Sequence, residues 1–330
     1  FPQINWFEII KQSNLKMKVS IITPAFNPGK LILETFISLQ NQTFKDFEWI
    51  IIDDCSDEMN KALFQQIKTD AGFSVIVISN PINFRQARSK NIGLQHAKGK
   101  YIKFLDADDL LDIDHLENQY NAIQELTYDK FAIFSPTLNF WQKGDKREEL
   151  LNTSYKKVNN NNFDQLKQFI VFPFFHHCGC LFLKQDIIDI NGFDDLMTTD
   201  EDGDLIIRLM LNGLLFIAQE DSVYLYRHHN QKRVSVNDSD EKWKDRLNVC
   251  KKMEVHFINK FSPLKEQLAQ RLDLLAIEAY RLNNPIYIDF LGKAKQLYPN
   301  YKFPGNKLQN LIRNFFGFKF MILIKSIIKS

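Results

Sequence analysis

The sequence predicts an α/β protein with a mostly parallel central sheet flanked by helices. Short apolar runs alternate with amphipathic stretches from residue 19 to about residue 135. The run at 48–52 shows no polar alternation, which is typical of a strand buried on both faces. Turn residues such as Pro28, Gly29 and Gly99 separate the runs from the amphipathic stretches.

Strands are expected, in order, at 19–22, 48–52, 73–78, 101–105 and 131–134. The amphipathic stretches between them predict crossover helices. One begins after Gly29 and places Leu31, Phe36 and Leu39 on one face. Two others are expected at 86–97, which ends before Gly99, and at about 114–126.

The second half of the chain has a less regular pattern. Residues 143–162 are polar and rich in Asn, and we interpret them as an irregular excursion. After them we expect a strand at 180–183, a turn at 192–193, a helix at 205–211 and a short edge strand at 222–226. From residue 239 the pattern is helical, with breaks at Pro263, Pro285 and Pro304.

The composition is that of an ordinary globular protein, with 42 Lys+Arg against 40 Asp+Glu and a net charge of +2. This balance argues against nucleic acid as a partner. The charge is unevenly distributed, because eight basic residues and no acidic residue follow Asp289. The last 41 residues therefore carry +8 and the first 289 carry −6.

Four cysteines without a CxxC pair favour a reducing compartment. No apolar run reaches the roughly 18 residues that a membrane-spanning helix needs. We interpret residues 1–17 as an N-terminal extension, because no signal pattern precedes the first strand and Met17 would be a natural start.

Three acidic residues, Asp106, Asp108 and Asp109, directly follow the expected strand at 101–105. Carboxylates this close repel one another unless a cation lies among them, and oxygen ligands suit Mg²⁺ or Mn²⁺. The alternative is a solvated acidic turn that caps the next helix.

A second acidic pair, Asp53 and Asp54, ends the strand at 48–52. Ligands of open α/β sheets bind beyond the carboxyl ends of the strands, so we expect Asp54 to lie near Asp108. Helix capping would account for the following Ser56 and Asp57, but not for the pair itself.

A third acidic group comprises Asp200, Glu201, Asp202 and Asp204, before a helix that carries Arg208. Acids in the first turn of a helix are favoured by its dipole, so capping is one interpretation. The other is that one of these carboxylates is a general base that takes a proton from an attacking hydroxyl.

Several segments, in this order, resemble the family 2 glycosyltransferases with the Rossmann-like GT-A fold. They are 18–27 (KVSIITPAFN), 39–44 (LQNQTF), 51–57 (IIDDCSD), 90–94 (KNIGL), 97–109 (AKGKYIKFLDADD), 192–194 (GFD), 201–209 (EDGDLIIRL) and 226–229 (YRHH). The resemblance implies transfer of a sugar from a nucleotide donor, usually a UDP-sugar, to an acceptor hydroxyl with inversion at the anomeric carbon.

The resemblance also implies roles for individual residues. Asp54 would contact the uracil ring, with Pro24, Phe26 and Asn27 at the floor of the nucleotide pocket. Asp106 and Asp108 match the DxD motif, with Asp108 as the direct ligand of Mn²⁺ or Mg²⁺ and Asp106 toward the ribose or a metal-bound water. Asp202 matches the catalytic base, and His229 matches a late histidine that ligates the metal or touches the diphosphate.

The chain departs from the family pattern at a few positions. Lys90 replaces a usual arginine, which keeps a positive charge near the diphosphate but loses the bidentate fork. Phe84 and Arg85 replace small residues, often glycine, after Asn83. The neighbouring His228 leaves the assignment of His229 ambiguous by one residue.

The segment His176-His177-Cys178-Gly179-Cys180 also suggests a zinc site, but it lacks the spacing of a structural one and no second ligand cluster accompanies it. We favour a strand that forms part of the acceptor side, where His176, His177 and Glu201 would contact the acceptor.

Residues 306–330 combine apolar residues at helical spacing with basic residues. Such a helix can lie on an anionic bilayer, at the inner face of the cell membrane for a cytoplasmic enzyme. The alternatives are a helix packed on the body of the protein and a homodimer contact.

Together these observations predict a GT-A domain at 18–238, with a donor half at about 18–135 and an acceptor half at about 136–238. A helical region would follow at 239–330. We expect a bacterial enzyme that builds a surface polysaccharide, lipopolysaccharide or glycolipid on a glycan or lipid-linked acceptor.

Three alternatives are less well supported. A processive synthase would need membrane-spanning helices and a QxxRW segment. A nucleotidyltransferase that forms nucleotide-sugars would need a basic, Gly-rich loop after the first strand, and residues 23–29 contain one glycine and no Lys or Arg. A catalytically silent nucleotide-sugar binding protein would not need Asp106, Asp108 and Asp202 together.

Overall fold

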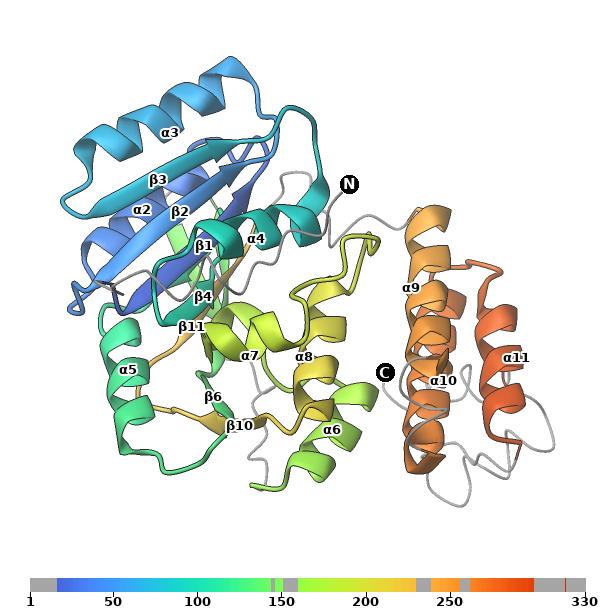
Figure 1. Cartoon of the computed structure of the whole chain (residues 1–330). Coiled ribbons are helices and arrows are strands. Elements are labelled where there is room, and N and C mark those ends of the chain that lie inside the picture. The colour runs from blue at the N-terminus through green and yellow to red at the C-terminus, as the bar shows by residue number, and fades with distance from the viewer. Residues whose placement is uncertain are drawn as a thin grey trace, which may run out of the picture. The chain divides into compact units, whose positions relative to one another are not determined.

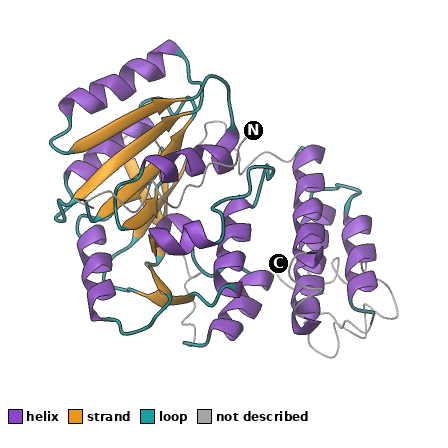
Figure 2. Ribbon diagram, in the orientation of Figure 1, coloured by secondary structure: helices purple, strands orange, loops and turns teal. Residues whose placement is uncertain are grey.

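The structure is a computed structural model, and it describes residues 17–143, 146–150, 160–229, 239–255, 262–299 and 318. The chain divides into two compact units (Figures 1 and 2). The first comprises Phe1–Leu166 and Pro173–Gln231, and the second comprises Lys167–Phe172 and Lys232–Ser330.

The first unit is built on a seven-stranded, mostly parallel sheet, which confirms the predicted fold class. Its strands are β1 (Val19–Ala25), β2 (Phe47–Asp53), β3 (Ser74–Ser79), β4 (Tyr101–Phe104), β6 (Phe131–Phe134), β9 (Cys180–Leu183) and β10 (Leu215–Ala218), in the order β10-β6-β9-β4-β1-β2-β3. Of these strands, β9 runs antiparallel to both its neighbours. Every residue of β2 is buried, as its uninterrupted apolar run predicted.

Helices cover the sheet of the first unit. They are α2 (Leu31–Gln40), α3 (Glu58–Asp70), α4 (Arg85–His96), α5 (His115–Glu125), α6 (Asn162–Val171), α7 (Lys184–Asp189) and α8 (Glu201–Leu211), of which α6 continues into the second unit. In Figure 1, α4 crosses in front of the sheet and α2 lies behind it. The close approach of α4 requires Gly93, because a Cβ atom there would lie 2.4 Å from Cγ2 of Ile22 on β1.

A second, four-stranded sheet corrects two predictions. Its strands are β5 (Leu110–Leu111), β7 (Thr137–Lys143), β8 (Lys146–Leu150) and β11 (Tyr224–His228), in the order β5-β11-β7-β8. The predicted irregular excursion at 143–162 therefore includes β8, which pairs antiparallel with β7. The predicted edge strand at 222–226 is β11, and it is internal because β5 and β7 pair with its two sides.

Other elements also differ from the sequence prediction. The strands β5, β7 and β10 and the helices α6 and α7 were not predicted, and α8 begins at Glu201 rather than at residue 205. Four-residue apolar runs such as β10 carry no periodicity that separates a strand from a buried helical turn.

The second unit is helical in its described part, as predicted. It contains α9 (Asp240–Met253), a short 3₁₀ helix (Ser262–Leu264), α10 (Lys265–Arg281) and α11 (Tyr287–Leu297). Pro263 and Pro285 precede α10 and α11, in agreement with the predicted breaks. The buried rings of Trp243 and Phe290 pack edge to face with centroids 6.2 Å apart.

Residues 1–16 of the predicted extension at 1–17, the boundary at 238 and the break at Pro304 lie outside the described residues. So does the predicted membrane-facing helix at 306–330, except for Phe318. The ring of Phe318 contacts Tyr280 and Tyr287, with centroids 5.9 Å from each. Among the described residues, no helix combines the length and apolar character needed to span a membrane.

Lys103 on β4 is a fully buried lysine in the first unit. Its ammonium group donates to Oε1 of Gln119 (3.1 Å) and to the carbonyl oxygen of Cys180 (3.3 Å). Burial lowers the pKa of Lys103 from 10.5 to about 7. The folded protein therefore holds this amine largely neutral at pH values where the unfolded chain protonates it.

This difference predicts a pH-dependent stability. Between pH 7 and 10 the amine of Lys103 is protonated in the unfolded state but largely neutral in the folded state. The free energy of unfolding should therefore rise with pH over this range, and Lys103 should contribute on the order of 4 kcal/mol to the rise. In Lys103→Met the rise should largely disappear, as measured by urea unfolding at several pH values. The exposed Lys98→Met is the control and should keep the wild-type slope. An unchanged slope in Lys103→Met would contradict the assignment.

Candidate active site

The carboxyl ends of β1, β2 and β4 meet at one edge of the large sheet. The N–H of Asp54 donates to the carbonyl oxygen of Ala25 (2.8 Å) at the end of β1. On the other side of β1, the N–H of Leu105 donates to the carbonyl oxygen of Ile22 (3.1 Å). Asp54 follows β2, and Asp106 follows Leu105 after β4, so these two acids come after the two strands that flank β1. The closeness of Asp54 and Asp108 stays a prediction.

The Asp54 carboxylate is buried and holds the loop that leads into α4. Its Oδ1 accepts hydrogen bonds from Nδ2 of Asn80 and the N–H of Phe84, both at 2.8 Å. Its Oδ2 accepts one from the N–H of Arg85, also at 2.8 Å. Because a carboxylate oxygen can accept two hydrogen bonds, Oδ2 retains capacity for one further donor.

Arg85 adopts a backbone conformation that favours glycine, with φ of 66°. This explains why a small residue, often glycine, is usual here in the family that the sequence resembles. For a residue with a Cβ atom, this conformation costs about 1–2 kcal/mol. The hydrogen bond from its N–H to Asp54 offsets part of that cost.

The predicted floor of the nucleotide pocket lies on the loop after β1. Pro24 is half-buried, while Phe26 is 56% exposed and Asn27 is also exposed. Asn27 has φ of 48°, and its Oδ1 accepts from the N–H of Asp57 (2.9 Å). Its own N–H donates to Oγ of Ser56 (3.0 Å). These bonds fix the loop against the start of α3.

Two other acidic side chains near Asp54 have structural roles, Asp57 as a helix cap and Asp53 in holding the adjoining loop. Asp57 caps α3 by accepting from the N–H of Asn60 (2.9 Å), as the capping interpretation held. Asp53 accepts from the N–H of Ser56 (2.8 Å) and Oγ of Ser79 (3.0 Å). Asp53 is therefore a structural residue of this edge.

The loop with Asp106, Asp108 and Asp109 is fixed from two sides. Asp109 is fully buried and accepts from the hydroxyl of Tyr224 and from the N–H of Arg227 (2.7 Å). Burial, and then the charges of Asp108 and Asp106, raise the pKa of Asp109 well above its ordinary value. Asp109 thus anchors the loop to β11.

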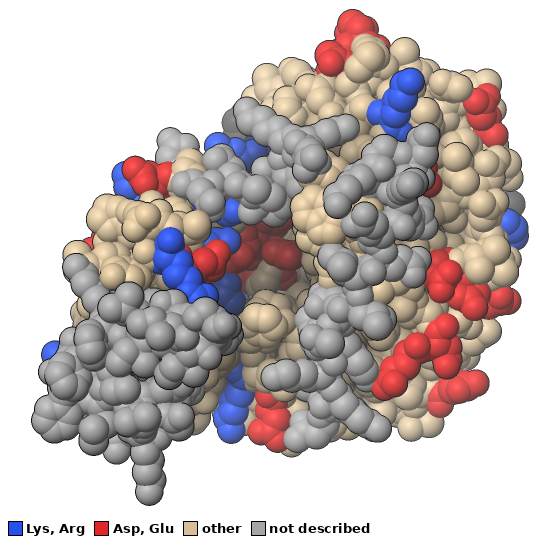
Figure 3. All heavy atoms as spheres, turned by 180° about the vertical axis from the view of Figure 1, so that it is seen from behind, with Lys and Arg blue, Asp and Glu red and all other residues tan. Residues whose placement is uncertain are grey.

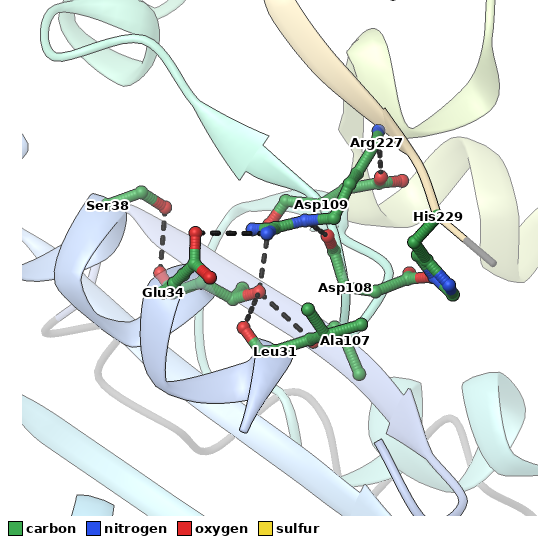
Figure 4. Close-up of polar contacts among 9 residues, drawn as sticks. Leu31, Glu34, Ser38, Ala107, Asp108, Asp109, Arg227 and His229 are labelled. Atoms are coloured by element: carbon green, nitrogen blue, oxygen red, sulfur yellow. Dashed lines mark hydrogen bonds and ion pairs between the residues drawn. The ribbon is translucent and has the colours of Figure 1, made fainter. Parts of the chain in front are cut away.

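The guanidinium group of Arg227 lies between Glu34 on α2 and the backbone of Asp108 (Figure 4). Nε donates to the carbonyl oxygen of Asp108 (2.6 Å), and an η nitrogen pairs with Glu34 (2.9 Å). The hydroxyl of Thr35 lies 3.1 Å from the carbonyl oxygen of Ala107 and 2.9 Å from that of Asp109. The loop is therefore held between α2 and β11.

The adjacent histidines at the end of β11, His228 in the strand and His229 after it, face different groups. His229 Nε2 lies 2.9 Å from Oδ2 of Asp108. His228 Nε2 lies 2.9 Å from Oδ1 of Asn139, and its ring stacks on Trp141. The geometry brings His229 rather than His228 to the acidic loop.

The side chains of Asp106, Asp108 and His229 carry oxygen and nitrogen atoms of the kind that bind a divalent cation. Asp108 and His229 bring an oxygen and a nitrogen within contact distance of each other. Burial raises the pKa of Asp106, and the charges of Asp108 and Asp202 raise it further, against the lowering effect of the Lys90 charge. Carboxylates that repel one another in this way, beside an imidazole, suit Mg²⁺ or Mn²⁺.

The acids at the start of α8 have separate partners. Asp204 is buried and pairs with Arg208 (2.7 Å), while Glu201 pairs with Lys90 (3.0 Å). Asp200 occupies the N-cap position, but its side chain makes no capping hydrogen bond. Asp202 contacts His177 and is about one-third exposed, with 36% of its side chain accessible. Among these acids, Asp202 combines exposure with a fixed position.

Lys90 on α4 has no exposed surface. Its ammonium group lies 3.0 Å from Oε1 of Glu201, 3.2 Å from Oε1 of Gln86 and 3.2 Å from Nε2 of His177. Burial alone would lower the pKa of Lys90, but the carboxylates of Glu201, Asp106 and Asp202 raise it above its ordinary value. The structure directs this charge toward α8 and the segment before β9.

The loop that leads into α8 is fixed by hydrogen bonds on both sides. Asn91 on α4 donates to the carbonyl oxygen of Phe193 (2.8 Å) and accepts from its N–H (2.9 Å). Arg208 donates to the carbonyl oxygens of Ile190 (2.9 Å) and Gly192 (2.8 Å). The predicted turn at 192–193 is present, with φ of 67° at Gly192.

The two histidines before β9 are placed differently. His177 lies between Lys90 and Asp202, with Nδ1 3.1 Å from Oδ2 of Asp202. His176 stacks on Tyr224, and burial lowers its pKa to about 4. Its Nδ1 accepts from the N–H of Cys178 (3.3 Å).

Candidate metal-ligand atoms of His176, His177 and Cys178 lie within 4.8 Å of one another. A zinc ion is nevertheless disfavoured there, because the Lys90 ammonium lies 3.2 Å from Nε2 of His177 and would repel it. Burial also raises the pKa of the Cys178 thiol well above its ordinary value, which opposes the thiolate that zinc requires.

Some residues of the site were not predicted from the sequence. Arg227 belongs to the motif at 226–229, but the sequence indicated no role for it. Glu34, Thr35 and Tyr224 carried no signal, since they fit an ordinary amphipathic helix and strand.

The face shown in Figure 3 carries both acidic and basic side chains, which are not separated into two regions.

Comparison with known proteins identifies the family. The sequence profile of glycosyl transferase family 2 matches residues 20–190. An uncharacterized glycosyltransferase of Methanocaldococcus jannaschii is 27% identical over 248 residues, which cover 71% of this chain and 82% of that protein. The amylovoran biosynthesis glycosyltransferase AmsB of Erwinia amylovora is 26% identical over 296 residues, or 87% of this chain and 91% of AmsB.

Other relatives align over a shorter part of their length. Poly(ribitol-phosphate) beta-N-acetylglucosaminyltransferase TarP of Staphylococcus aureus is 36% identical over 121 residues, which cover 33% of each protein. Among solved structures, S. aureus TarS 1-349 in complex with UDP-GlcNAc aligns with a TM-score of 0.65 at 18% identity, over 86% of this chain and 82% of TarS 1-349. This likeness shows the GT-A fold. The chain belongs to glycosyl transferase family 2 and is a glycosyltransferase.

Proposed function

We propose that the protein transfers a sugar from a UDP-sugar to a hydroxyl group of a glycan or glycolipid acceptor, with inversion and with a divalent cation. Asp202 is the general base in this proposal, and Asp106, Asp108 and His229 hold the cation. The observation that carries it is the closeness of two segments far apart in the sequence: the ring of Phe104 at the end of β4 lies 6.2 Å from that of His177, and Nδ1 of His177 lies 3.1 Å from Oδ2 of Asp202. Burial raises the pKa of Asp106, and the charges of Asp108 and Asp202 raise it further, which supports a shared site.

Asp202 suits the role of base by its exposure and charge. Burial would raise the pKa of Asp202, but the hydrogen bond from His177, and further the charge of Lys90, lower it below its ordinary value. The carboxylate is therefore ionised at neutral pH and about one-third accessible to an acceptor hydroxyl. In a single inverting displacement, this carboxylate accepts the hydroxyl proton as the oxygen attacks the anomeric carbon.

The chemistry of the cation follows from the donor set. When bound by Asp106, Asp108 and His229, Mn²⁺ or Mg²⁺ would neutralise the charge that develops on the departing nucleoside diphosphate. Arg227 and Glu34 keep Asp108 in place for this role by fixing its backbone. A single displacement needs no protein nucleophile, and Asp202 is assigned no covalent step.

The hydrogen-bonding capacity of Asp54 supports a UDP-sugar as the sugar donor. Its Oδ2 can accept one further hydrogen bond, and the imino N–H of uracil is a suitable donor. TarS, which shares the fold, is described in complex with UDP-GlcNAc. Phe26 and Asn27 lie on the adjoining loop and would contact the ring and the ribose.

The acceptor is proposed from the relatives. TarP is named for transfer of N-acetylglucosamine to poly(ribitol phosphate), and AmsB for amylovoran biosynthesis. These names support a surface-glycan acceptor. Association of residues 306–330 with an anionic membrane, and a homodimer, stay predictions from the sequence.

A donor screen tests the proposed function. With Mn²⁺, UDP should be released from at least one UDP-sugar, whereas the corresponding CDP compound should be inactive, because the N3 atom of cytosine is an acceptor that would face Asp54. The nucleotide is varied rather than Asp54, since Asp54 also holds the N–H groups of Phe84 and Arg85. Turnover of CDP- or GDP-sugars alone would contradict the uracil contact, and absence of any turnover would contradict the function.

Replacement of the proposed base gives a second prediction. Asp202→Asn should lower kcat by roughly 10²–10⁴-fold, because proton removal is lost, with the Kd for UDP changed little. Asp200→Asn is the matched control and should keep a near-normal kcat. Asn tolerates the left-handed conformation at this position (φ 57°), and the Asp200 side chain makes no capping hydrogen bond. Near-normal kcat in Asp202→Asn would show that another group is the base.

The adjacent histidines give a matched test of the metal site. His229→Asn should raise the Mn²⁺ concentration needed for half-maximal activity by about tenfold or more, because a ligand is lost. His228→Asn should leave it unchanged, since His228 faces Asn139 and Trp141. The measurement is a Mn²⁺ titration of UDP release, and equal effects of the two variants would reject His229 as a ligand.

A further inference from the structure

The environment of Lys90 limits what its ammonium group can do. A lysine ammonium has three N–H donors and no acceptor. Three acceptors surround it at 3.0–3.2 Å, namely Oε1 of Glu201, Oε1 of Gln86 and Nε2 of His177. The side chain has no exposed surface. All three donors are therefore engaged within the protein, and none is directed at a donor diphosphate.

This arrangement determines the tautomer of His177. Because the ammonium can only donate, Nε2 of His177 must present its lone pair to Lys90, and the ring proton must lie on Nδ1. The Cys178 thiol, 3.4 Å from the same Nε2, is also a donor in its protonated form. Burial, and then the Lys90 charge, lower the pKa of His177, which keeps the ring neutral.

Nδ1 of His177 lies 3.1 Å from Oδ2 of Asp202. This is the close polar contact that Asp202 makes among the described residues. One oxygen of Asp202 thus lies against a neutral imidazole, and Oδ1 is left for an acceptor hydroxyl.

We propose that Lys90 and His177 are positioning residues for Asp202, with Lys90 fixing the Nδ1–H tautomer of His177 and His177 orienting the Asp202 carboxylate. This inference rests on the proposed role of Asp202 as the base. It assigns Lys90 and His177 roles other than the diphosphate and acceptor contacts that the resemblance and the sequence suggested.

The surrounding charges are consistent with this role. Glu201 balances the buried charge of Lys90, and the ring of Phe193 lies 5.1 Å from the ammonium. Asp106 and His176 are the other titratable groups that influence the pair of His177 and Asp202. Removal of His177 would leave Asp202 beside a buried ammonium with no intervening group.

A matched pair of substitutions separates positioning from packing. The amide nitrogen of Asn occupies the place of Nδ1, whereas the amide of Gln occupies the place of Nε2. His177→Asn therefore keeps a donor for Asp202, and His177→Gln keeps the contact with Lys90 but loses that donor. We expect kcat to fall roughly 10–100-fold in His177→Gln and by less in His177→Asn, with the KM of the acceptor unchanged in both.

Two kinetic outcomes would overturn the assignment. An equal loss of kcat in the two variants would mean that His177 acts through packing. A rise in acceptor KM at unchanged kcat would make it an acceptor contact.

The role of Lys90 is tested by nucleotide binding. Lys90→Gln should keep the Kd for UDP within about twofold of the wild-type value while kcat falls, because the ammonium does not reach the diphosphate. A loss of UDP affinity without a loss of kcat would return Lys90 to the diphosphate.

The ring proton can be observed without turnover, which separates this inference from the proposed function. In ¹⁵N-histidine-labelled wild-type protein at neutral pH, His177, identified by the signal lost in His177→Asn, should show a protonated Nδ1 and an unprotonated Nε2. This result would support the arrangement even if no donor were turned over. A protonated Nε2, in either a neutral or a charged ring, would overturn it whatever the outcome of the donor screen.

Discussion

A fully buried positive charge, the ammonium group of Lys90, constrains the candidate active site more than any other interaction that the structure describes. Such a charge is tolerated only when every donor is satisfied, and its acceptors come from α4, α8 and the segment before β9. Breaking a buried pair of this kind costs about 3–5 kcal/mol. The need to satisfy Lys90 therefore fixes Glu201 and His177, and through them the start of α8, where Asp202 lies.

The acidic loop after β4 is fixed by a different set of contacts. Arg227 and Tyr224 on β11 and Thr35 and Glu34 on α2 hold its backbone and Asp109, so that Asp108 faces His229. The site thus has two anchored parts, one with the proposed cation ligands and one with the proposed base. Both are pre-oriented by buried hydrogen bonds, which limits the reorganisation needed during group transfer.

The sequence predicted what depends on local pattern. The parallel strands and the acids at the ends of β2 and β4 follow from apolar runs and their boundaries, and the motifs identified the family. The contact of Lys90 with His177, 87 residues away, has no local signature. The strand β8 was missed because its residues, Lys146 to Leu150, are mostly charged, and it forms by pairing with β7. The left-handed backbone conformation of Arg85 was not predicted either, because local sequence patterns assign this conformation to Gly or Asn rather than to a bulky residue.

The proposed mechanism is a single displacement at the anomeric carbon with Asp202 as the base. It is tested by the anomeric configuration of the product, determined by ¹H NMR after transfer from an α-linked UDP-sugar to a defined acceptor. Inversion requires a β-linked product. An α-linked product would contradict it, because retention requires either a protein nucleophile or attack from the face of the leaving group, and neither role is assigned to Asp202.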